Sequence, residues 1–170
     1  MKRLFEWKGH SYVGLVLRVY LASVFLFACV HKIISPEDFA VDIATYQILP
    51  TVLINPMALV LPFIEAFAGV LLFIGFYTRG ASLLICGMMT IFTAAVSIAL
   101  AHGLDMSCGC FASKGAAEDP ISWKTIVRDT CWLVLSIYVL IFDDGRIGLD
   151  GLLRKRQAKK SGVFQKEIKQ

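Results

Sequence analysis

Four long runs of apolar residues dominate the pattern of hydrophobic and polar positions along the chain. The runs cover residues 12–34, 51–76, 81–101 and 123–142. A helix of about 20 residues crosses a hydrocarbon core roughly 30 Å thick, so each run is long enough to span a membrane. The pattern predicts an all-α fold, with a four-helix transmembrane bundle in residues 1–145 and a basic cytoplasmic tail in residues 146–170.

The first apolar run has a second interpretation, because it follows the basic residues Lys2, Arg3 and Lys8. A positive segment before an apolar one is typical of a cleaved signal peptide. This run is longer than the apolar core of a signal peptide, and no convincing cleavage site follows it. A retained first transmembrane helix is therefore favoured.

A short amphipathic helix is predicted between the first two runs. Ser35-Pro36-Glu37-Asp38 has the residue types of a helix start, with serine at the N-cap, proline at the first helical position and acids in the first turn. Phe39, Ile43 and Tyr46 follow at near-helical spacing, and Pro50 marks the end. We expect this helix to lie on the outer membrane surface.

The composition and the charges indicate how the chain sits in a lipid bilayer. Hydrophobic residues make up 57% of the chain and charged residues 18%, whereas soluble proteins contain about 25% charged residues. The net charge of +4 comes mainly from basic residues at the ends of apolar runs. This placement is a signal of membrane topology and does not indicate a nucleic-acid-binding face.

The placement of Lys and Arg predicts the orientation of the spans. Basic residues concentrate before the first run, at Arg79 and in the tail, whereas the first and third connections are mainly acidic. The positive-inside rule then places both termini in the cytoplasm of a bacterial inner membrane and the third connection in the periplasm. We expect the tail to be mobile and to dock on anionic headgroups through its charges.

The third connection carries a Cys-x-Cys motif, Cys108-Gly109-Cys110-Phe111. On the outer side of the membrane, disulfides form and persist. A disulfide across one intervening residue is strained, and strained, exposed disulfides behave as labile or catalytic bonds. We therefore predict that Cys108 and Cys110 perform thiol–disulfide exchange, with Cys108 as the attacking thiolate because it lies nearer to His102.

Two other interpretations of the motif stay open. Met106, Cys108, Cys110 and His102 offer soft ligands that suit Cu(I) or Zn. Zinc sites, however, usually separate paired cysteines by two to four residues and bring a second pair, so we predict no metal site. In the other interpretation, the two cysteines form a structural bridge that braces the loop.

Polar residues at the outer ends of the runs form the expected surroundings of the motif. These residues are Cys29, His31, Lys32, His102, Arg128, Asp129 and Cys131. Cationic neighbours lower the pKa of a thiol and favour the thiolate, so the basic members are expected to support the redox pair. Cys29 and Cys131 are candidate resolving thiols, although core packing is favoured for each. The adjacent Arg128 and Asp129 could also form a local salt bridge.

Two ionisable residues lie inside the apolar runs, where a charge is costly and marks a pair or a functional site. Arg18 lies about 10 Å from the cytoplasmic end of the first span, and Glu65 roughly 15 Å from the same end of the second. Because these depths are similar, we predict an ion pair between Arg18 and Glu65 that joins the two helices. A quinone or proton site at the same two residues is the alternative.

Several stretches carry a resemblance to a known family. They are Pro62-x-x-Glu65 followed by Gly69, Leu72, Gly75 and Thr78-Arg79, the Cys108-Gly109-Cys110-Phe111 motif, Trp123 with Arg128-Asp129, and Tyr46-x-x-Leu49-Pro50. Together they resemble the DoxX-like group of four-helix membrane proteins, and within it the MauE branch, associated with methylamine utilisation. The resemblance covers about residues 12–142. It departs at Ala112-Ser113, where the family usually has glycine after the phenylalanine.

The resemblance implies a redox-associated role with an exported thiol protein or a thioredoxin-like protein as partner. The chain would help that partner form or reshuffle disulfides, as MauE is thought to support the small subunit of methylamine dehydrogenase, and electrons would leave to a membrane quinone or a thioredoxin-like protein. The wider DoxX-like group implies instead a subunit of a quinone-linked oxidoreductase acting on sulfur compounds. A non-catalytic membrane assembly protein is the third hypothesis.

Overall fold

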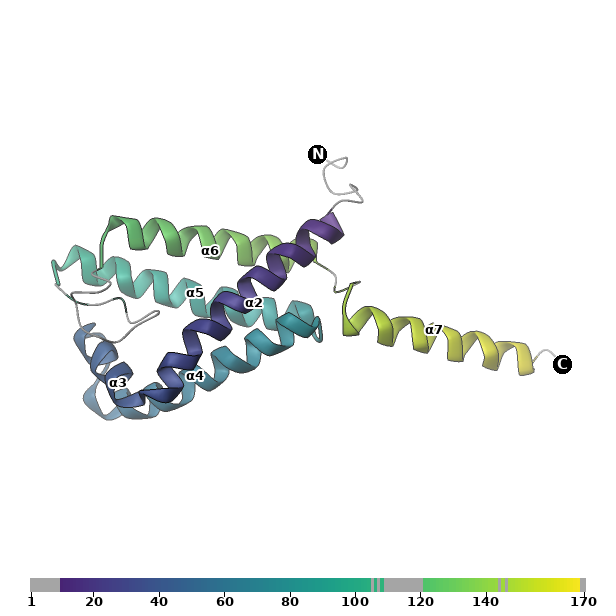
Figure 1. The fold of residues 1–170 in the computed structure, drawn as a ribbon, viewed down its shortest axis with the longest axis horizontal. Helices are drawn as coiled ribbons and strands as arrows, with labels where there is room; N and C mark the ends of the chain where they lie inside the picture. The colour runs from purple at the N-terminus through teal and green to yellow at the C-terminus, as the bar shows by residue number, and fades with distance from the viewer. Residues whose placement is uncertain are drawn as a thin grey trace.

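The computed structural model describes residues 10–104, 106, 108, 121–143, 145 and 147–168. Within this part of the chain the helices are α2 (His10–Ile34), α3 (Pro36–Thr45), α4 (Thr51–Ile74), α5 (Thr78–Ala101), α6 (Trp123–Phe142) and α7 (Leu149–Ile168) (Figure 1). Four of them, α2, α4, α5 and α6, are long and apolar enough to cross a membrane. The predicted all-α, four-span fold is confirmed.

The four long helices pack in two pairs. Helix α2 packs mainly on α4, which it crosses diagonally, and α5 packs mainly on α6 (Figure 1). Small residues let α2 and α4 approach closely, as is common between membrane helices. A Cβ added to Gly69 of α4, for example, would lie 3.1 Å from the side chain of Leu26. The shared core of the bundle contains Leu21, Ala22, Phe25, Ala68, Leu72, Ala81, Ile85, Met89 and Val139.

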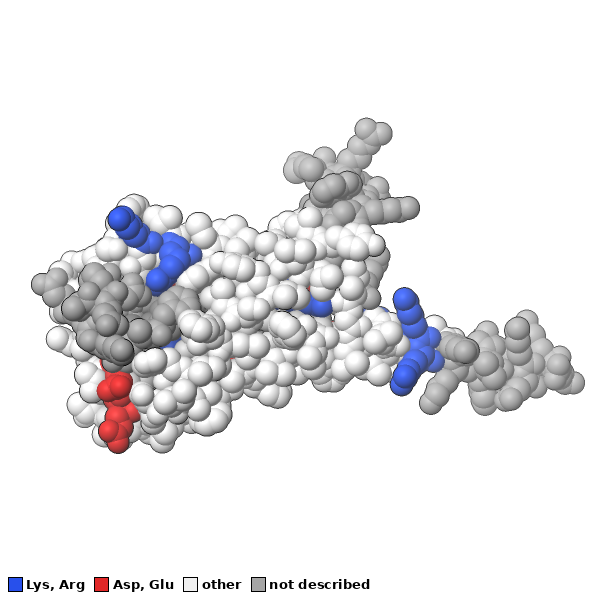
Figure 2. Space-filling model, in the orientation of Figure 1, with Lys and Arg blue, Asp and Glu red and all other residues white. Residues whose placement is uncertain are grey.

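The surface of the bundle has the polarity that a membrane requires. Charged side chains lie mainly toward the two ends of the molecule, with a wide uncharged zone between them (Figure 2). Large apolar side chains within the spanning helices are exposed, among them Phe27, Phe63 and Ile91. A continuous exposed apolar surface of this kind marks contact with lipid. The chain is a multi-pass membrane protein.

Helix α3 begins where the sequence predicts and ends earlier. Ser35 occupies the N-cap position and Pro36 the first helical position. The prediction that this helix runs on to Pro50 was wrong, because Gln47 adopts a positive φ of 55°, a conformation that a right-handed helix cannot contain. Phe39 and Ile43 of α3 pack on α4.

The segment after the last span contains a helix that the sequence analysis did not predict. Helix α7 extends away from the bundle (Figure 1). Its sequence is rich in Leu, Lys, Arg and Gln, which all favour helices through their intrinsic propensities. Because α7 has no apolar stripe, hydrophobic periodicity could not predict it.

Candidate functional site

The chain segments on both sides of the Cys-x-Cys motif are held against the end of α5. Gly103 adopts a positive φ of 67°, and the Leu104 amide donates to the Ala99 carbonyl at 3.2 Å, an arrangement that ends a helix sharply. Past the motif, the Ile121 amide donates to the Met106 carbonyl at 3.0 Å. These contacts hold the residues just before the motif next to the start of α6.

Cys108 is held from two different helices. Its side chain is buried, at 1% exposure, and it is disulfide-bonded. The hydroxyl of Tyr46, at the end of α3, donates to the Cys108 carbonyl at 2.9 Å. Nη2 of Arg128, in α6, donates to the Cys108 sulfur at 3.2 Å. Cys110, the second cysteine of the predicted pair, lies outside the described residues.

Arg128 links the cysteine to the interior of the bundle. Its Nε donates to Oδ1 of Asp129 at 3.1 Å, and its guanidinium lies 5.1 Å from the centroid of the Trp132 ring. Asp129 is fully buried. The predicted local salt bridge between Arg128 and Asp129 is therefore present, and the same guanidinium also reaches the sulfur. A cation at this position stabilises a thiolate once the disulfide is reduced.

The other predicted neighbours of the motif are more dispersed. His31 is half-buried near the end of α2, and His102 is exposed at the end of α5. Cys29 is buried in α2, where its thiol donates to the Leu26 carbonyl at 3.1 Å, and Cys131 is an exposed free thiol on α6. The hydrogen bonds of the described residues thus connect Cys108 to Arg128 and Tyr46. Tyr46 was not predicted as a site residue, although its place at the end of an amphipathic helix beside the loop was a signal.

Among the residues that the structure describes, no three His, Cys, Asp or Glu side chains lie together in a way that could hold a metal ion. Cys110, which the metal interpretation needs, is outside that part.

The predicted ion pair between Arg18 and Glu65 was wrong, because each residue has another partner. Lys32 Nζ lies 2.9 Å from both carboxylate oxygens of Glu65, in a buried position. The same ammonium group lies 5.0 Å from the centroid of the Phe39 ring. Arg18 instead pairs with Asp143, with 3.2 Å between Nη1 and Oδ2.

The crossing of α2 over α4 explains this difference. Arg18 lies beside Gly75, at the very end of α4, where an added Cβ would be 2.9 Å from Nη2 of Arg18. Gly75 follows Glu65 by ten residues, or about 15 Å along a helix. The estimate from the sequence assumed that the cytoplasmic ends of the first two spans lie at the same level. In the structure, the first part of α2 extends beyond the end of α4.

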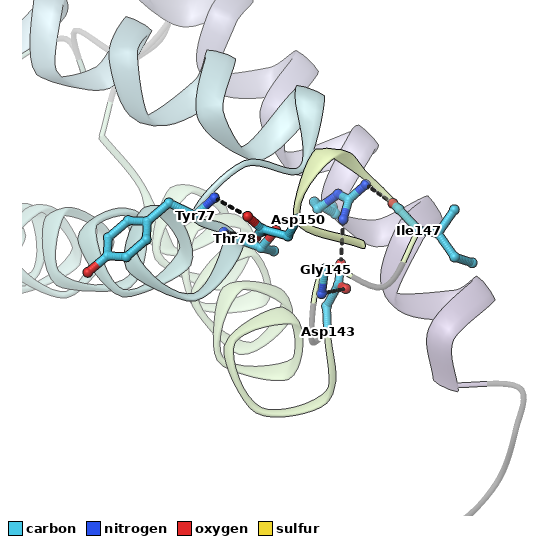
Figure 3. A network of polar contacts seen from close by, with 7 residues as sticks. Tyr77, Thr78, Asp143, Gly145, Ile147 and Asp150 are labelled. Carbon is cyan, nitrogen blue, oxygen red and sulfur yellow. Dashed lines mark hydrogen bonds and ion pairs between the residues drawn. The ribbon is translucent and has the colours of Figure 1, made fainter. Parts of the chain in front are cut away.

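Arg18 is the centre of a buried polar network whose partners follow the end of α6 (Figure 3), at the opposite end of α5 and α6 from Cys108. Besides its pair with Asp143, Arg18 donates from Nη2 to the Ile147 carbonyl at 2.6 Å. Oδ1 of Asp143 accepts a hydrogen bond from the Gly145 amide at 2.8 Å. The network ties α2 to the segment that follows α6, which indicates a structural role for Arg18.

Asp150, in the first turn of α7, caps the start of α5. Its carboxylate accepts hydrogen bonds from the amides of Tyr77 and Thr78, both at 3.0 Å, and from the Thr78 hydroxyl at 3.2 Å (Figure 3). Partial burial acts to raise the pKa of Asp150, but the hydrogen bonds from Thr78 and Tyr77 and the charge of Arg154 outweigh it, so the pKa is lowered. Asp150 and Asp143 were not singled out from the sequence, because both lie beyond the last apolar run.

A cavity of about 230 Å³ lies between α3, α4 and α5 and reaches the cysteine. Tyr46, Met57, Phe92 and Cys108 are among its lining residues, and Glu65 is one of its acidic residues. A smaller cavity of about 50 Å³ also borders Glu65, and its walls include Lys32, Asp129 and Trp132. Glu65 therefore borders both cavities.

A family model described as methylamine utilisation protein MauE matches residues 10–142. The chain belongs to the MauE family. Its relatives include the MauE proteins of Paracoccus denitrificans, 28% identical over 72% of this chain and 66% of that protein, and of Methylorubrum extorquens, 29% identical over 66% and 60%. The chain spans about two thirds of the length of the curated relatives it matches. No solved structure matches the chain.

The family match confirms the predicted resemblance at the level of MauE, and membership of the wider DoxX-like group stays a prediction. The matched residues include Cys108, Arg128, Lys32 and Glu65, whereas the last residues of the Arg18 network lie beyond them. The contacts around the cysteine and the cavity thus belong to the part of the chain shared with the MauE family.

Proposed function

We propose that this chain is an accessory membrane protein of methylamine utilisation that exchanges disulfides with an exported partner through Cys108 and Cys110. The observation that carries the proposal is the buried, disulfide-bonded sulfur of Cys108, which accepts a hydrogen bond from the Arg128 guanidinium. A buried sulfur beside a fixed cation is suited to be a leaving group. MauE family membership supports the role in methylamine utilisation.

The burial of Cys108 changes the order of attack expected from the sequence. In the proposed reaction, a thiolate of the partner attacks the sulfur of Cys110, and the bond between Cys110 and Cys108 breaks. Cys108 leaves as a thiolate, which the Arg128 guanidinium stabilises. A second partner thiolate then attacks the partner sulfur of the mixed disulfide and releases Cys110. The partner loses two electrons, and the two thiol protons end on Cys108 and Cys110.

The proposed location is a bacterial inner membrane with both termini in the cytoplasm and the Cys-x-Cys motif in the periplasm. The charge asymmetry of the connections supports this orientation. The partner is then an exported protein with thiols, or a thioredoxin-like protein that delivers the disulfide. A periplasmic location keeps the reaction in a compartment where disulfides persist.

Trapping of mixed disulfides tests the proposal. The full chain is expressed in cells as Cys108→Ser or Cys110→Ser, with Cys131→Ser as the control, because Cys131 is an exposed cysteine outside the motif. Because Cys108 is buried and the proposed reaction begins at Cys110, Cys108→Ser is expected to accumulate a covalent complex through Cys110, whereas Cys110→Ser accumulates much less. Both variants are expected to leave partner thiols reduced, and Cys131→Ser to behave as the wild type.

Two outcomes would contradict the proposal. Partner disulfides that form normally in both variants would rule out exchange by the motif. Equal trapping by the two variants would rule out Cys108 as the leaving sulfur. Labelling of intact cells with a membrane-impermeant thiol reagent, before and after reduction, tests the orientation, because a cytoplasmic motif would not react.

A further inference from the structure

We propose that the cavity between α3, α4 and α5 binds the head group of a membrane quinone, which accepts the electrons of the reduced Cys108–Cys110 pair. The inference rests on the proposed function and names its electron acceptor. It replaces the hypothesis of a quinone site at Arg18 and Glu65, since Arg18 lies in a separate network at the other end of the bundle.

The size of the cavity suits a single substituted ring. Its volume is about 230 Å³, below the roughly 300–1,000 Å³ of pockets for larger ligands, so a folded peptide segment does not fit. Its walls are almost entirely apolar, with the aromatic rings of Tyr46 and Phe92 and the thioethers of Met57 and Met88 among them. Flat, adaptable walls of this kind favour a planar apolar ring.

The cavity also borders the lipid. Ile48, in the connection between α3 and α4, and Ile91, in α5, line it, and both are exposed on the outer surface of the molecule, at 48% and 69%. A ligand with an apolar chain could therefore place its ring in the cavity and its chain among the lipid tails. This geometry favours a lipid-soluble acceptor over a water-soluble one.

A few polar side chains from different elements line the cavity. Cys108 contributes to one part of the wall, and the acidic residues Asp42 and Glu65 contribute to others. The carboxylate of Glu65 is held in place by Lys32, whose Nζ lies 2.9 Å from both oxygens. A few fixed polar groups in an apolar pocket orient a ligand.

Reoxidation of the two motif cysteines requires a two-electron acceptor, and a quinone can fill this role. After exchange, Cys108 and Cys110 are both reduced to thiols. The other described cysteines, Cys29, Cys86 and Cys131, are free thiols and do not form a second disulfide with one another. In the proposed step the Cys108 thiolate adds to the quinone ring, and the Cys110 thiolate then attacks the Cys108 sulfur. The disulfide forms, the carbon–sulfur bond breaks, and the ring keeps the electron pair. The two thiol protons end on the quinone oxygens, giving a hydroquinone.

Filling the cavity tests the inference. Ala95 lines the cavity, whereas its neighbour Ala94 is exposed on the lipid side of α5, so Ala95→Phe and Ala94→Phe form a matched pair. Each full-length protein is reduced, placed in lipid nanodiscs and mixed with decylubiquinone, and reoxidation is followed by thiol labelling. A separate single-turnover reaction of the oxidised protein with a dithiol peptide, without quinone, measures exchange alone.

The two reactions separate the inference from the proposed function. We expect decylubiquinone to reoxidise the wild type and the Ala94→Phe variant, and Ala95→Phe to be slowed at least tenfold while it still oxidises the peptide. Equal rates of reoxidation in both variants, or no reoxidation of the wild type, would overturn the quinone site and leave disulfide exchange intact. A wild type that fails to oxidise the peptide would overturn the proposed function. If Ala95→Phe does not fold, Leu61→Phe fills the same cavity, with the exposed Leu59→Phe as its control.

Discussion

Nη2 of Arg128 donates a hydrogen bond to the sulfur of Cys108 at 3.2 Å. The two residues belong to different parts of the fold, since Arg128 lies in the second turn of α6 and Cys108 follows the end of α5. The guanidinium is itself fixed by the buried carboxylate of Asp129 and by the ring of Trp132. In the proposed exchange, this fixed cation remains beside Cys108 when the disulfide opens, and the thiolate gains a charge-assisted contact with it.

Removal of this cation is expected to make the Cys108 disulfide harder to reduce. Arg128→Gln loses the charge that stabilises the thiolate, and a hydrogen bond to a charged group contributes about 1.5–3 kcal/mol. The equilibrium between the disulfide and a dithiol reductant should shift about tenfold or more toward the disulfide, measured by thiol labelling in defined redox buffers. Arg128→Lys should recover part of the shift, and Lys124→Gln, an exposed charge on the same helix, should leave it unchanged. An unchanged equilibrium in Arg128→Gln would contradict the role of the cation.

The Lys32–Glu65 pair predicts a non-additive pattern of stability. Glu65→Leu leaves the Lys32 ammonium buried without its carboxylate, which should cost about 3 kcal/mol in the free energy of unfolding. The double variant Lys32→Met with Glu65→Leu removes both charges and should regain most of that loss. Unfolding in mixed detergent micelles measures the values. A double variant as unstable as the sum of the single ones would show that the two residues act independently.

A double-mutant cycle separates the observed partner of Arg18 from the one expected from the sequence. Arg18→Gln combined with Asp143→Asn should show a coupling energy of about 1 kcal/mol or more, because the two side chains form a buried ion pair. The same Arg18→Gln combined with Glu65→Gln should be additive within about 0.5 kcal/mol. Strong coupling between Arg18 and Glu65 would contradict the arrangement of α2 and α4 described above.

The cap that Asp150 places on α5 should depend on pH. Its pKa is lowered in the folded protein, so its stabilising effect is complete above the unfolded pKa of about 3.9. The effect is lost as the pH falls through the lowered folded value. Asp150→Asn should reduce the free energy of unfolding by about 1 kcal/mol at neutral pH, and its difference from the wild type should shrink below pH ~4. A difference that does not change with pH would show that the charge of Asp150 is not involved.

The positions of the spans could be predicted from the sequence alone. Helix α4 begins at Thr51 and α6 covers Trp123–Phe142, both as the apolar runs predict. A lipid core leaves few other solutions, because every buried backbone group must be paired within its own helix and the core thickness sets the helix length. Helix α7 lies outside the apolar runs, and the early end of α3 depends on the backbone of Gln47. Hydrophobic periodicity carries no information about either.

The sequence by itself determined that Arg18, Glu65 and Arg128 had to find partners, since buried ions are costly alone. Only the tertiary structure decided which partners they have. Glu65 pairs with Lys32 across 33 positions of sequence, and Arg18 pairs with Asp143 across 125. Such pairs depend on the angle at which α2 crosses α4 and on how the segment after α6 returns to the bundle. These features arise from the packing of whole helix surfaces, and no single run of residues encodes them.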